Sequence, residues 1–154
     1  VSNKSRMSAN DAAEQLSALD LNLKEIDEET AGKVFESIKG LKQVKDVVVF
    51  NTEGKALHAT MDLPEKEIVE LTTLYTDKKT ALQKAITLKG ERHEVHRFFA
   101  KEGLIYGRLG KGSKDSIGAA LIKNFSNVIV LVTYGFPYLS ARVLPLVRKE
   151  LSKF

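Results

Sequence analysis

The chain has 154 residues, of which 43% are hydrophobic and 29% charged, a composition typical of a single globular domain rather than a disordered chain. The absence of cysteine excludes disulfides, thiolate nucleophiles and cysteine-ligated zinc. No stretch approaches the roughly 20 apolar residues of a membrane span, and the first residues lack the apolar core of a signal peptide. We therefore expect a cytoplasmic protein.

The net charge of +4 is unevenly distributed. Residues 10–30 contain one base, Lys24, and seven acids: Asp11, Glu14, Asp20, Glu25, Asp27, Glu28 and Glu29. Two interpretations stay open, a solvated tail or a segment that folds back on the basic body and competes with an acidic partner. We expect residues 1–29 to form a flexible acidic extension and residues 30–154 to form the domain.

Apolar spacing predicts a helix from Thr30 to about Gly40. Its apolar positions are Val34, Phe35, Ile38 and Leu41. Two β-rich runs in residues 44–62, joined at Gly54, predict a hairpin. A second helix is expected after Pro64, with an apolar face of Ile68, Leu71, Leu74 and Tyr75.

Five consecutive strands are expected between residues 85 and 135. They lie in residues 85–90, 91–100, 102–110, 115–124 and 127–135, and their short links favour antiparallel neighbours. The run VIVLV (128–132) is apolar at every position, which predicts a strand covered by helices on both faces. A last helix is indicated by Val143, Val147, Leu151 and Phe154. Pro145 predicts that this helix begins near it or has a distorted first turn.

The stretch IYGRLGKGS (105–113) raises the question of a phosphate loop. Gly107 and Gly112 have the required spacing, but Ser113 stands where the lysine must be. The following residues predict a strand, so no helix N-terminus is available to receive phosphate. A basic turn between strands, in which the glycines serve the backbone, is therefore favoured.

The sequence gives no pattern for catalysis or metal binding. His93 and His96 are three residues apart on a predicted strand, so they point to opposite faces and do not readily chelate one ion, even with His58 as a third candidate. No nucleophile elbow is present. We expect no catalytic residues, no metal, no cofactor and no enzymatic activity.

Basic residues follow one another along the predicted strands: Lys89, Arg92, Arg97, Lys101, Arg108, Lys111 and Lys114. They are either scattered surface charges or one patch for an acidic protein or an anionic lipid headgroup. Nucleic acid is not expected as a partner, because aromatic interleaving and recognition motifs are missing.

Residues 86–113, ITLKGERHEVHRFFAKEGLIYGRLGKGS, resemble the central hairpin of the profilins. The similarity extends to VVVFNTEGKALHAT (47–60) and to the C-terminal residues 128–154, so it covers roughly Thr30 to Phe154. It implies an α+β fold, an antiparallel sheet with the N- and C-terminal helices on one face and a further helix on the other. It also implies a monomeric, cytoskeleton-associated protein that binds actin monomers and regulates their polymerisation. The acidic N-terminal segment has no counterpart in ordinary profilins, and we expect a divergent, archaeal-type member with an N-terminal extension.

The resemblance also implies site residues. Val95 and Arg97 match the family's VIR motif with His96 in place of the isoleucine, and Arg108 belongs to its YGR motif. The implied actin-binding residues are Arg92, Val95, His96, Arg97, Arg108, Lys111, Tyr138 and Arg142. Arg97, Arg108 and Lys111 are also the implied phosphoinositide-binding residues.

Profilins bind proline-rich segments between aromatic residues of their terminal helices and a tryptophan of the second strand. This chain has no tryptophan. The residues at the matching places are Phe35, Leu57, Leu151 and Phe154. Because aromatic rings dominate such contacts, we expect weak or altered binding of proline-rich proteins.

An alternative interpretation of the whole chain is a dimeric scaffold of the roadblock or longin type that binds a small GTPase.

Overall fold

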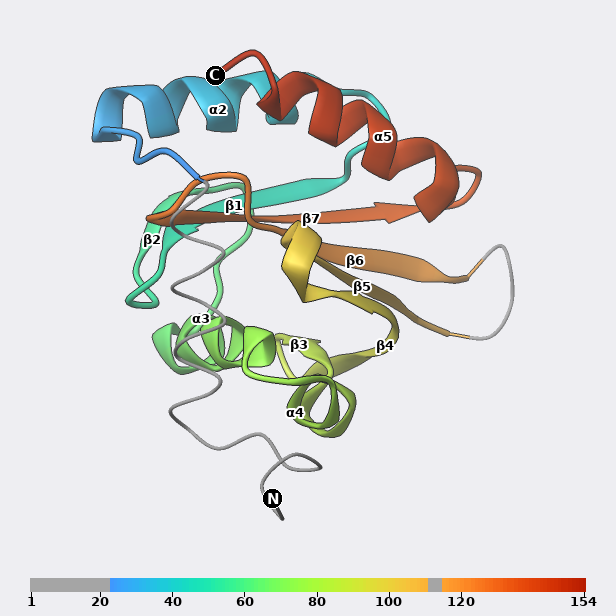
Figure 1. Cartoon of the computed structure of the whole chain (residues 1–154). Coiled ribbons are helices and arrows are strands. Elements are labelled where there is room, and N and C mark those ends of the chain that lie inside the picture. The colour runs from blue at the N-terminus through green and yellow to red at the C-terminus, as the bar shows by residue number, and fades with distance from the viewer. Residues whose placement is uncertain (1–22, 111–114) are drawn as a thin grey trace.

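The computed structural model describes residues 23–110 and 115–154 (Figure 1). The helices are α2 (Glu28–Lys39), α3 (Glu65–Thr72), α4 (Lys78–Lys84) and α5 (Ser140–Leu151), with 3₁₀ turns η2 (Thr73–Tyr75) and η3 (Ala100–Glu102). The strands are β1 (Asp46–Asn51), β2 (Ala56–Ala59), β3 (Ile86–Leu88), β4 (Glu91–Phe99), β5 (Leu104–Leu109), β6 (Ile117–Ile122) and β7 (Val128–Gly135). The hairpin and all five expected later strands are present.

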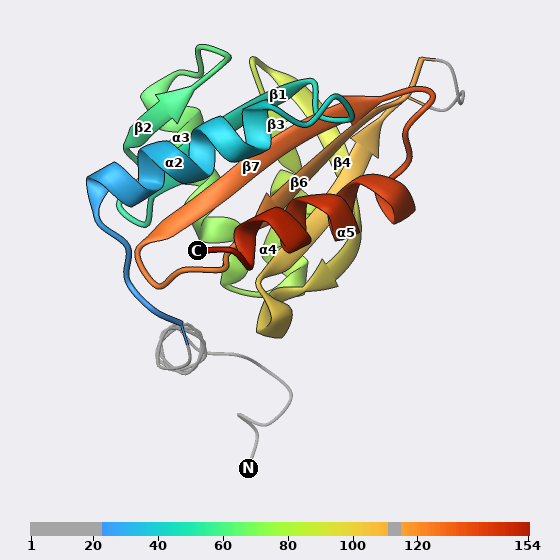
Figure 2. The same ribbon diagram turned by 90° about the horizontal axis from the view of Figure 1, so that it is seen from above.

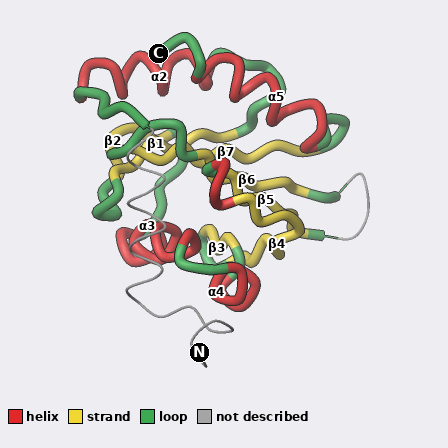
Figure 3. Tube along the Cα trace, viewed as in Figure 1, coloured by secondary structure: helices red, strands yellow, loops and turns green. Residues whose placement is uncertain are grey.

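The strands form one seven-stranded antiparallel sheet in the order β2-β1-β7-β6-β5-β4-β3. Helices α2 and α5 cover one face, and α3 and α4 lie against the other (Figures 1 and 3). Seen from above, α2 and α5 lie side by side over the sheet (Figure 2), and Ser37 Oγ donates a hydrogen bond of 2.9 Å to Glu150 Oε1 between them. The expected α+β architecture is confirmed.

Strand β7 separates two hydrophobic cores. Val128, Val130 and Val132 belong to the core under α2 and α5. Ile129 and Leu131 belong to the core that contains the buried residues of α3 and α4. The prediction that the apolar run VIVLV forms a strand covered on both faces is therefore confirmed.

The domain begins earlier than Thr30. Asp27 caps α2, because its Oδ1 accepts a 2.8 Å hydrogen bond from the Thr30 amide, and Glu28 and Glu29 occupy the first turn, where negative charge complements the helix dipole. Ile26 is buried and its amide donates to Asn127 Oδ1 at 3.1 Å. The expectation that residues 1–29 form a flexible extension is therefore wrong for this part; residues 1–22 lie outside the described residues.

Two helices differ from expectation. Helix α5 begins at Ser140, five residues before Pro145, which lies inside it. Helix α4 was not expected, because only Ala81 of its seven residues is buried and the apolar pattern is too thin to predict it. None of the described helices is long and apolar enough to cross a membrane.

Candidate protein-binding groove

Strand β4 contains a bulge at His96. Val95 lies opposite Gly107 of β5 and Arg97 lies opposite Tyr106, so the residue between them has no partner in the register. Such an extra residue bends a strand and redirects side chains. His96 and Arg97 are both exposed as a result.

Gly107 allows the two strands to meet at this bulge. A Cβ atom at this position would lie 1.8 Å from the Glu94 carbonyl oxygen, which no side chain tolerates. Gly107 therefore has a backbone role, but in strand β5 rather than in the turn where the sequence placed it.

A groove lies between the bulge and the start of α5. Its lining residues are His96, Arg97, Tyr106, Gly107, Arg108, Leu139, Ser140 and Ala141, and its volume is about 280 Å³. It brings together three of the residues implied for actin binding, His96, Arg97 and Arg108. We call it the basic groove.

The two arginines of the basic groove are not neutralised within the described part of the chain. Arg97 Nη1 donates a 2.9 Å hydrogen bond to the His96 carbonyl, a contact that orients the guanidinium without removing its charge. Arg108 lies opposite Glu94 in the register, but the Glu94 carboxylate pairs with Arg92 Nε at 3.2 Å. Neither groove arginine forms an ion pair with a described residue, so both are available to an acidic partner.

Tyr134 fixes the other wall of the groove. Its hydroxyl and Ser140 Oγ, at the first turn of α5, lie 2.6 Å apart. Burial of the Tyr134 ring raises the pKa of its phenol, so the group stays neutral and hydrogen-bonded at ordinary pH. Gly118 makes room for the ring, since a Cβ there would lie 2.2 Å from Tyr134 Cε2. The start of α5 is thereby tied to β7.

The β7–α5 connection adds apolar surface that sequence analysis missed. Phe136 and Leu139 are 55% and 50% exposed, among the most exposed large apolar side chains of the described residues. The signal is present in the sequence GFPYLS, where Phe136 precedes a proline and Leu139 follows it two positions later, outside any periodic pattern. Basic and apolar surface therefore adjoin each other, which is typical of a protein-binding site.

Other residues implied for actin binding lie elsewhere. Val95 is buried in the core beside α3 and α4, because its pairing with Gly107 turns it to that face; the expected apolar contact from Val95 is wrong. Arg92 lines a separate cleft with residues of α3 and α4. Arg142 is exposed on α5 but does not line the groove, and Tyr138 lines another cavity. Lys111 lies outside the described residues.

The residues implied for polyproline binding lie in or against the core under α2 and α5. Leu151 is 1% exposed, because the apolar stripe of α5 faces the sheet, so it is not available to a ligand and that expectation is wrong. Phe35 is 8% exposed and stacks on His58 with ring centroids 5.4 Å apart. Leu57 and Phe154 are half-buried. His58, a third metal candidate by sequence, is thus an aromatic partner of Phe35.

The histidines do not converge. Buried His93 places Nδ1 2.9 Å from the Ile86 carbonyl, while His96 lies at the groove and His58 lies against α2. Within residues 23–110 and 115–154, no three His, Asp or Glu side chains are arranged to hold a metal ion.

No protein-family model and no curated protein sequence matches this chain, whereas solved structures do. A Schizosaccharomyces pombe profilin shares 19% identity at a TM-score of 0.65, covering 80% of this chain and 93% of that one. LokiProfilin1, solved with rabbit actin, shares 12% identity at 0.60, covering 84% and 96%. Mouse profilin IIa, solved with a double repeat from the FH1 domain of mDia1, shares 11% at 0.60, covering 77% and 91%. The structure described here has the profilin fold.

Proposed function

We propose that this protein binds actin monomers and regulates their polymerisation through the basic groove. The observation that carries the proposal is the juxtaposition of Arg97 and Arg108, which have no ion-pair partner among the described residues, with exposed Leu139. The fold supports it, because LokiProfilin1 and LokiProfilin2, which share this fold, were solved in complexes with rabbit actin. No catalytic step is part of the proposal.

The chemistry of the groove suits an acidic protein surface. Guanidinium groups pair with carboxylates in a planar two-point geometry, and their charge increases the rate of encounter. Leu139 and Phe136 supply apolar area at the edge of the charged region. Burial of this area would add affinity, while the arginines would set orientation and specificity.

The same arginines are the proposed phosphoinositide contacts. A lipid headgroup phosphate would use the donors that actin carboxylates use, so the two ligands are expected to compete. This proposal is tested by adding vesicles that contain phosphatidylinositol bisphosphate to the actin complex. Undiminished actin binding at saturating lipid would reject a shared site.

Binding of proline-rich segments is proposed to be weak. Mouse profilin IIa was solved with an FH1 repeat, but this chain has no tryptophan and Phe35 has one ring face occupied by His58. Lys39 Nζ lies 5.7 Å from the centre of the same ring. Little aromatic surface is left for proline rings, so millimolar rather than micromolar affinity for a proline oligomer is expected, a difference of about 4 kcal/mol.

An actin polymerisation assay tests the main proposal. Wild type is expected to slow spontaneous assembly of monomers, whereas Arg97→Glu and Arg108→Glu are expected to slow it much less. Lys55→Glu is the matched control, since it makes the same charge change in the exposed β1–β2 turn at the opposite edge of the sheet. Equal activity of all four proteins, or no activity of wild type on actin from a matched source, would reject the proposal.

The GTPase scaffold is not favoured, because the matched structures named above are profilins. We propose that the protein is a monomer in the cytoplasm. Light scattering tests the oligomeric state, and a tight homodimer would revive the scaffold alternative.

A further inference from the structure

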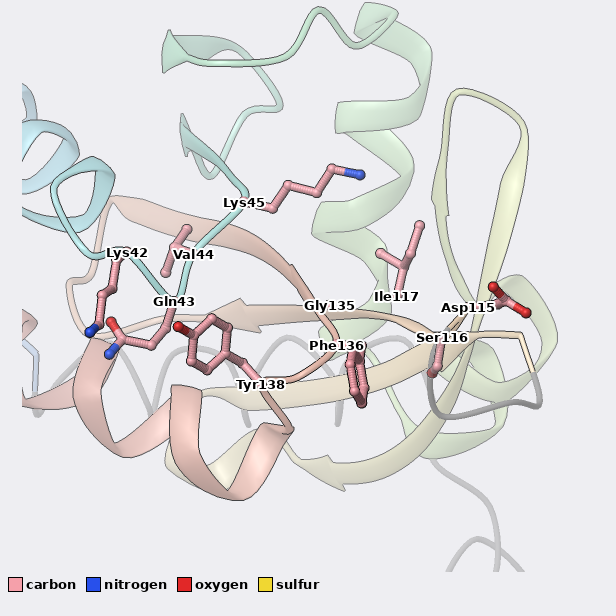
Figure 4. A pocket seen from close by; sticks show the side chains of 10 residues that line it. All are labelled: Lys42, Gln43, Val44, Lys45, Asp115, Ser116, Ile117, Gly135, Phe136 and Tyr138. Carbon is pink, nitrogen blue, oxygen red and sulfur yellow. The ribbon is translucent and has the colours of Figure 1, made fainter.

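A second cavity lies near the basic groove and has a different lining. It is formed by the connection from α2 to β1, the first residues leading into β6, and the connection from β7 to α5 (Figure 4). Its lining residues are Lys42, Gln43, Val44, Lys45, Asp115, Ser116, Ile117, Gly135, Phe136 and Tyr138, and its volume is about 510 Å³. This size is in the range of small-ligand sites.

Three hydrogen-bonding side chains gather at one end of this cavity. In Figure 4 the ends of Lys42 and Gln43 lie on the same side of the cavity, and the Tyr138 hydroxyl points toward that side. None of the three side chains has a hydrogen-bond or ion-pair partner among the described residues. An ammonium, an amide and a phenol that face the same space can all donate to one oxyanion.

The cavity also contains a buried hydroxyl that the protein leaves unsatisfied. Ser116 is 7% exposed, and its Oγ has no hydrogen-bond partner. It is the only described side chain with a buried N or O atom in this condition. Buried polar groups are nearly always paired, so this hydroxyl is a hydrogen-bonding group at the cavity that the described residues leave for another partner.

The remaining lining residues make the two ends of the cavity chemically different. Val44, Ile117 and the 55% exposed Phe136 supply apolar surface between the two ends. Asp115 lies at the end away from Lys42 (Figure 4), where its charge would repel an anion. The Lys45 side chain points away from Lys42 and Gln43 (Figure 4). An anionic group would therefore sit toward Lys42, and an apolar body toward Phe136.

We propose that this cavity binds a small organic anion. Its phosphate or carboxylate group accepts hydrogen bonds from Lys42, Gln43 and Tyr138, and its aromatic or other flat apolar body packs on Phe136. A polar atom of the ligand pairs with Ser116 Oγ. The proposal stands on this cavity alone and does not depend on actin binding.

Amide NMR spectra of the full-length protein test this site. Titration with phenyl phosphate is expected to shift the amide signals of the lining residues, with Ser116 and Gly135 among them, and to saturate. Inorganic phosphate, which lacks the apolar body, is expected to bind about tenfold more weakly, and neutral benzyl alcohol more weakly still. Phenylacetate in a parallel titration shows whether the preferred head is a carboxylate or a phosphate.

Two variants connect the binding to these side chains. Lys42→Glu is expected to weaken phenyl phosphate binding by at least about tenfold, and Ser116→Ala by less, because only one neutral hydrogen bond is lost. Lys33→Glu is the control, an equal charge change at an exposed position of α2 that does not line the cavity. A conservative Ser116→Ala change keeps the site testable if Lys42→Glu affects folding.

The outcomes separate the possibilities. Saturable shifts confined to the lining and lost in Lys42→Glu support the site. The vesicle test uses an Arg97→Glu/Arg108→Glu background, which removes the lipid contacts proposed for the basic groove. Loss of the remaining binding to phosphatidylinositol bisphosphate vesicles on adding Lys42→Glu would identify the anion as a lipid headgroup, and unchanged binding would identify it as a soluble molecule. Shifts spread over the basic groove instead of this cavity, or equal binding by wild type and Lys42→Glu, would overturn the proposal.

Discussion

A Cβ atom on Gly107 would lie 1.8 Å from the carbonyl oxygen of Glu94, so the backbones of β5 and β4 are in direct contact where β4 bulges. The contact shapes the basic groove, because His96 and Arg97 at the bulge line this groove together with Arg108. One glycine thus links the strand pairing to the position of the cations.

Gly107→Ala is expected to destabilise the protein strongly. The added methyl group meets backbone, which cannot move aside as a flexible side chain can, so the strands must separate locally. We expect the free energy of unfolding to fall by about 3 kcal/mol in urea denaturation. Gly32→Ala is the control, because its Cβ would meet only His58 ring atoms at 3.4 Å or more and alanine favours the helix. Equal stability of the two variants would show that β4 and β5 do not approach this closely.

Leu139→Ser is expected to weaken actin binding without lowering stability. Leu139 is 50% exposed at the mouth of the groove, so little core packing is lost, while apolar area at the interface disappears. A loss of about tenfold in affinity is expected, equivalent to about 1.4 kcal/mol.

The matched control for Leu139 is Val69→Ser. Val69 is 41% exposed on α3, which lies on the other face of the sheet, and it does not line the groove. Fluorescence titration of labelled actin with both variants measures their affinities for actin. If Val69→Ser weakened binding as much as Leu139→Ser, the contact surface would have to include α3.

Tyr134 and Ser140 are expected to be energetically coupled. Removal of either hydroxyl in Tyr134→Phe or Ser140→Ala breaks the 2.6 Å hydrogen bond and is expected to cost about 1 kcal/mol. The double variant is expected to cost little more than one single change, since the same bond is lost. Urea denaturation of wild type, the two single variants and the double variant gives a double-mutant cycle. If the losses of unfolding free energy in the two single variants added up to the loss in the double variant, the two hydroxyls would not interact.

Asp27 is expected to make the stability of α2 pH-dependent. The Thr30 hydrogen bonds, chiefly the one with the side chain, lower the pKa of Asp27 below its ordinary value of 3.8. A carboxylate with a depressed pKa in the folded state stabilises it fully above the unfolded-state pKa, and this contribution disappears as the pH falls through the folded-state value. Wild type is therefore expected to be more stable than Asp27→Ala at pH 6.

The difference between wild type and Asp27→Ala is expected to close at acidic pH, below the lowered pKa. Thermal unfolding followed by circular dichroism across this range provides the measurement. Glu28→Gln is the control, because this residue lies in the first turn but is not the residue whose side chain caps the helix. A stability difference that stayed constant down to the most acidic pH would contradict capping by the charged carboxylate.

The strands were predictable because their signal is local. The strands lie in β-rich runs separated by short turn sequences, the unbroken apolar run of β7 follows from its two covered faces, and the short links leave antiparallel pairing as the simple solution. Helix α4 lacked such a signal, since it is short and buries a single alanine. The sequence does not mark the start of α2, because its acidic residues are equally typical of a solvated tail; in the structure Asp27 caps the helix.

The candidate sites were predictable only in part. His96, Arg97 and Arg108, which the resemblance assigns to actin binding, line one groove, whereas Val95 and Leu151 are buried. A sequence shows that Val95 is apolar, and only the register with Gly107 shows which face it joins. The cavity of Lys42 and Ser116 could not have been predicted, because its lining comes from three connections far apart in the chain.

By itself the sequence determined the fold class, the covering of both faces of β7 and the presence of basic residues on neighbouring strands. These properties depend on the spacing of apolar and charged residues within short segments, so they can be recognised without knowing how distant segments pack. Only the tertiary structure decided which cations share a groove, which apolar residues stay exposed and where hydrogen-bonding groups lack partners. The physical reason is that these properties arise from distances between segments, and a single bulge at His96, matched to Gly107, is enough to change the face that a side chain occupies.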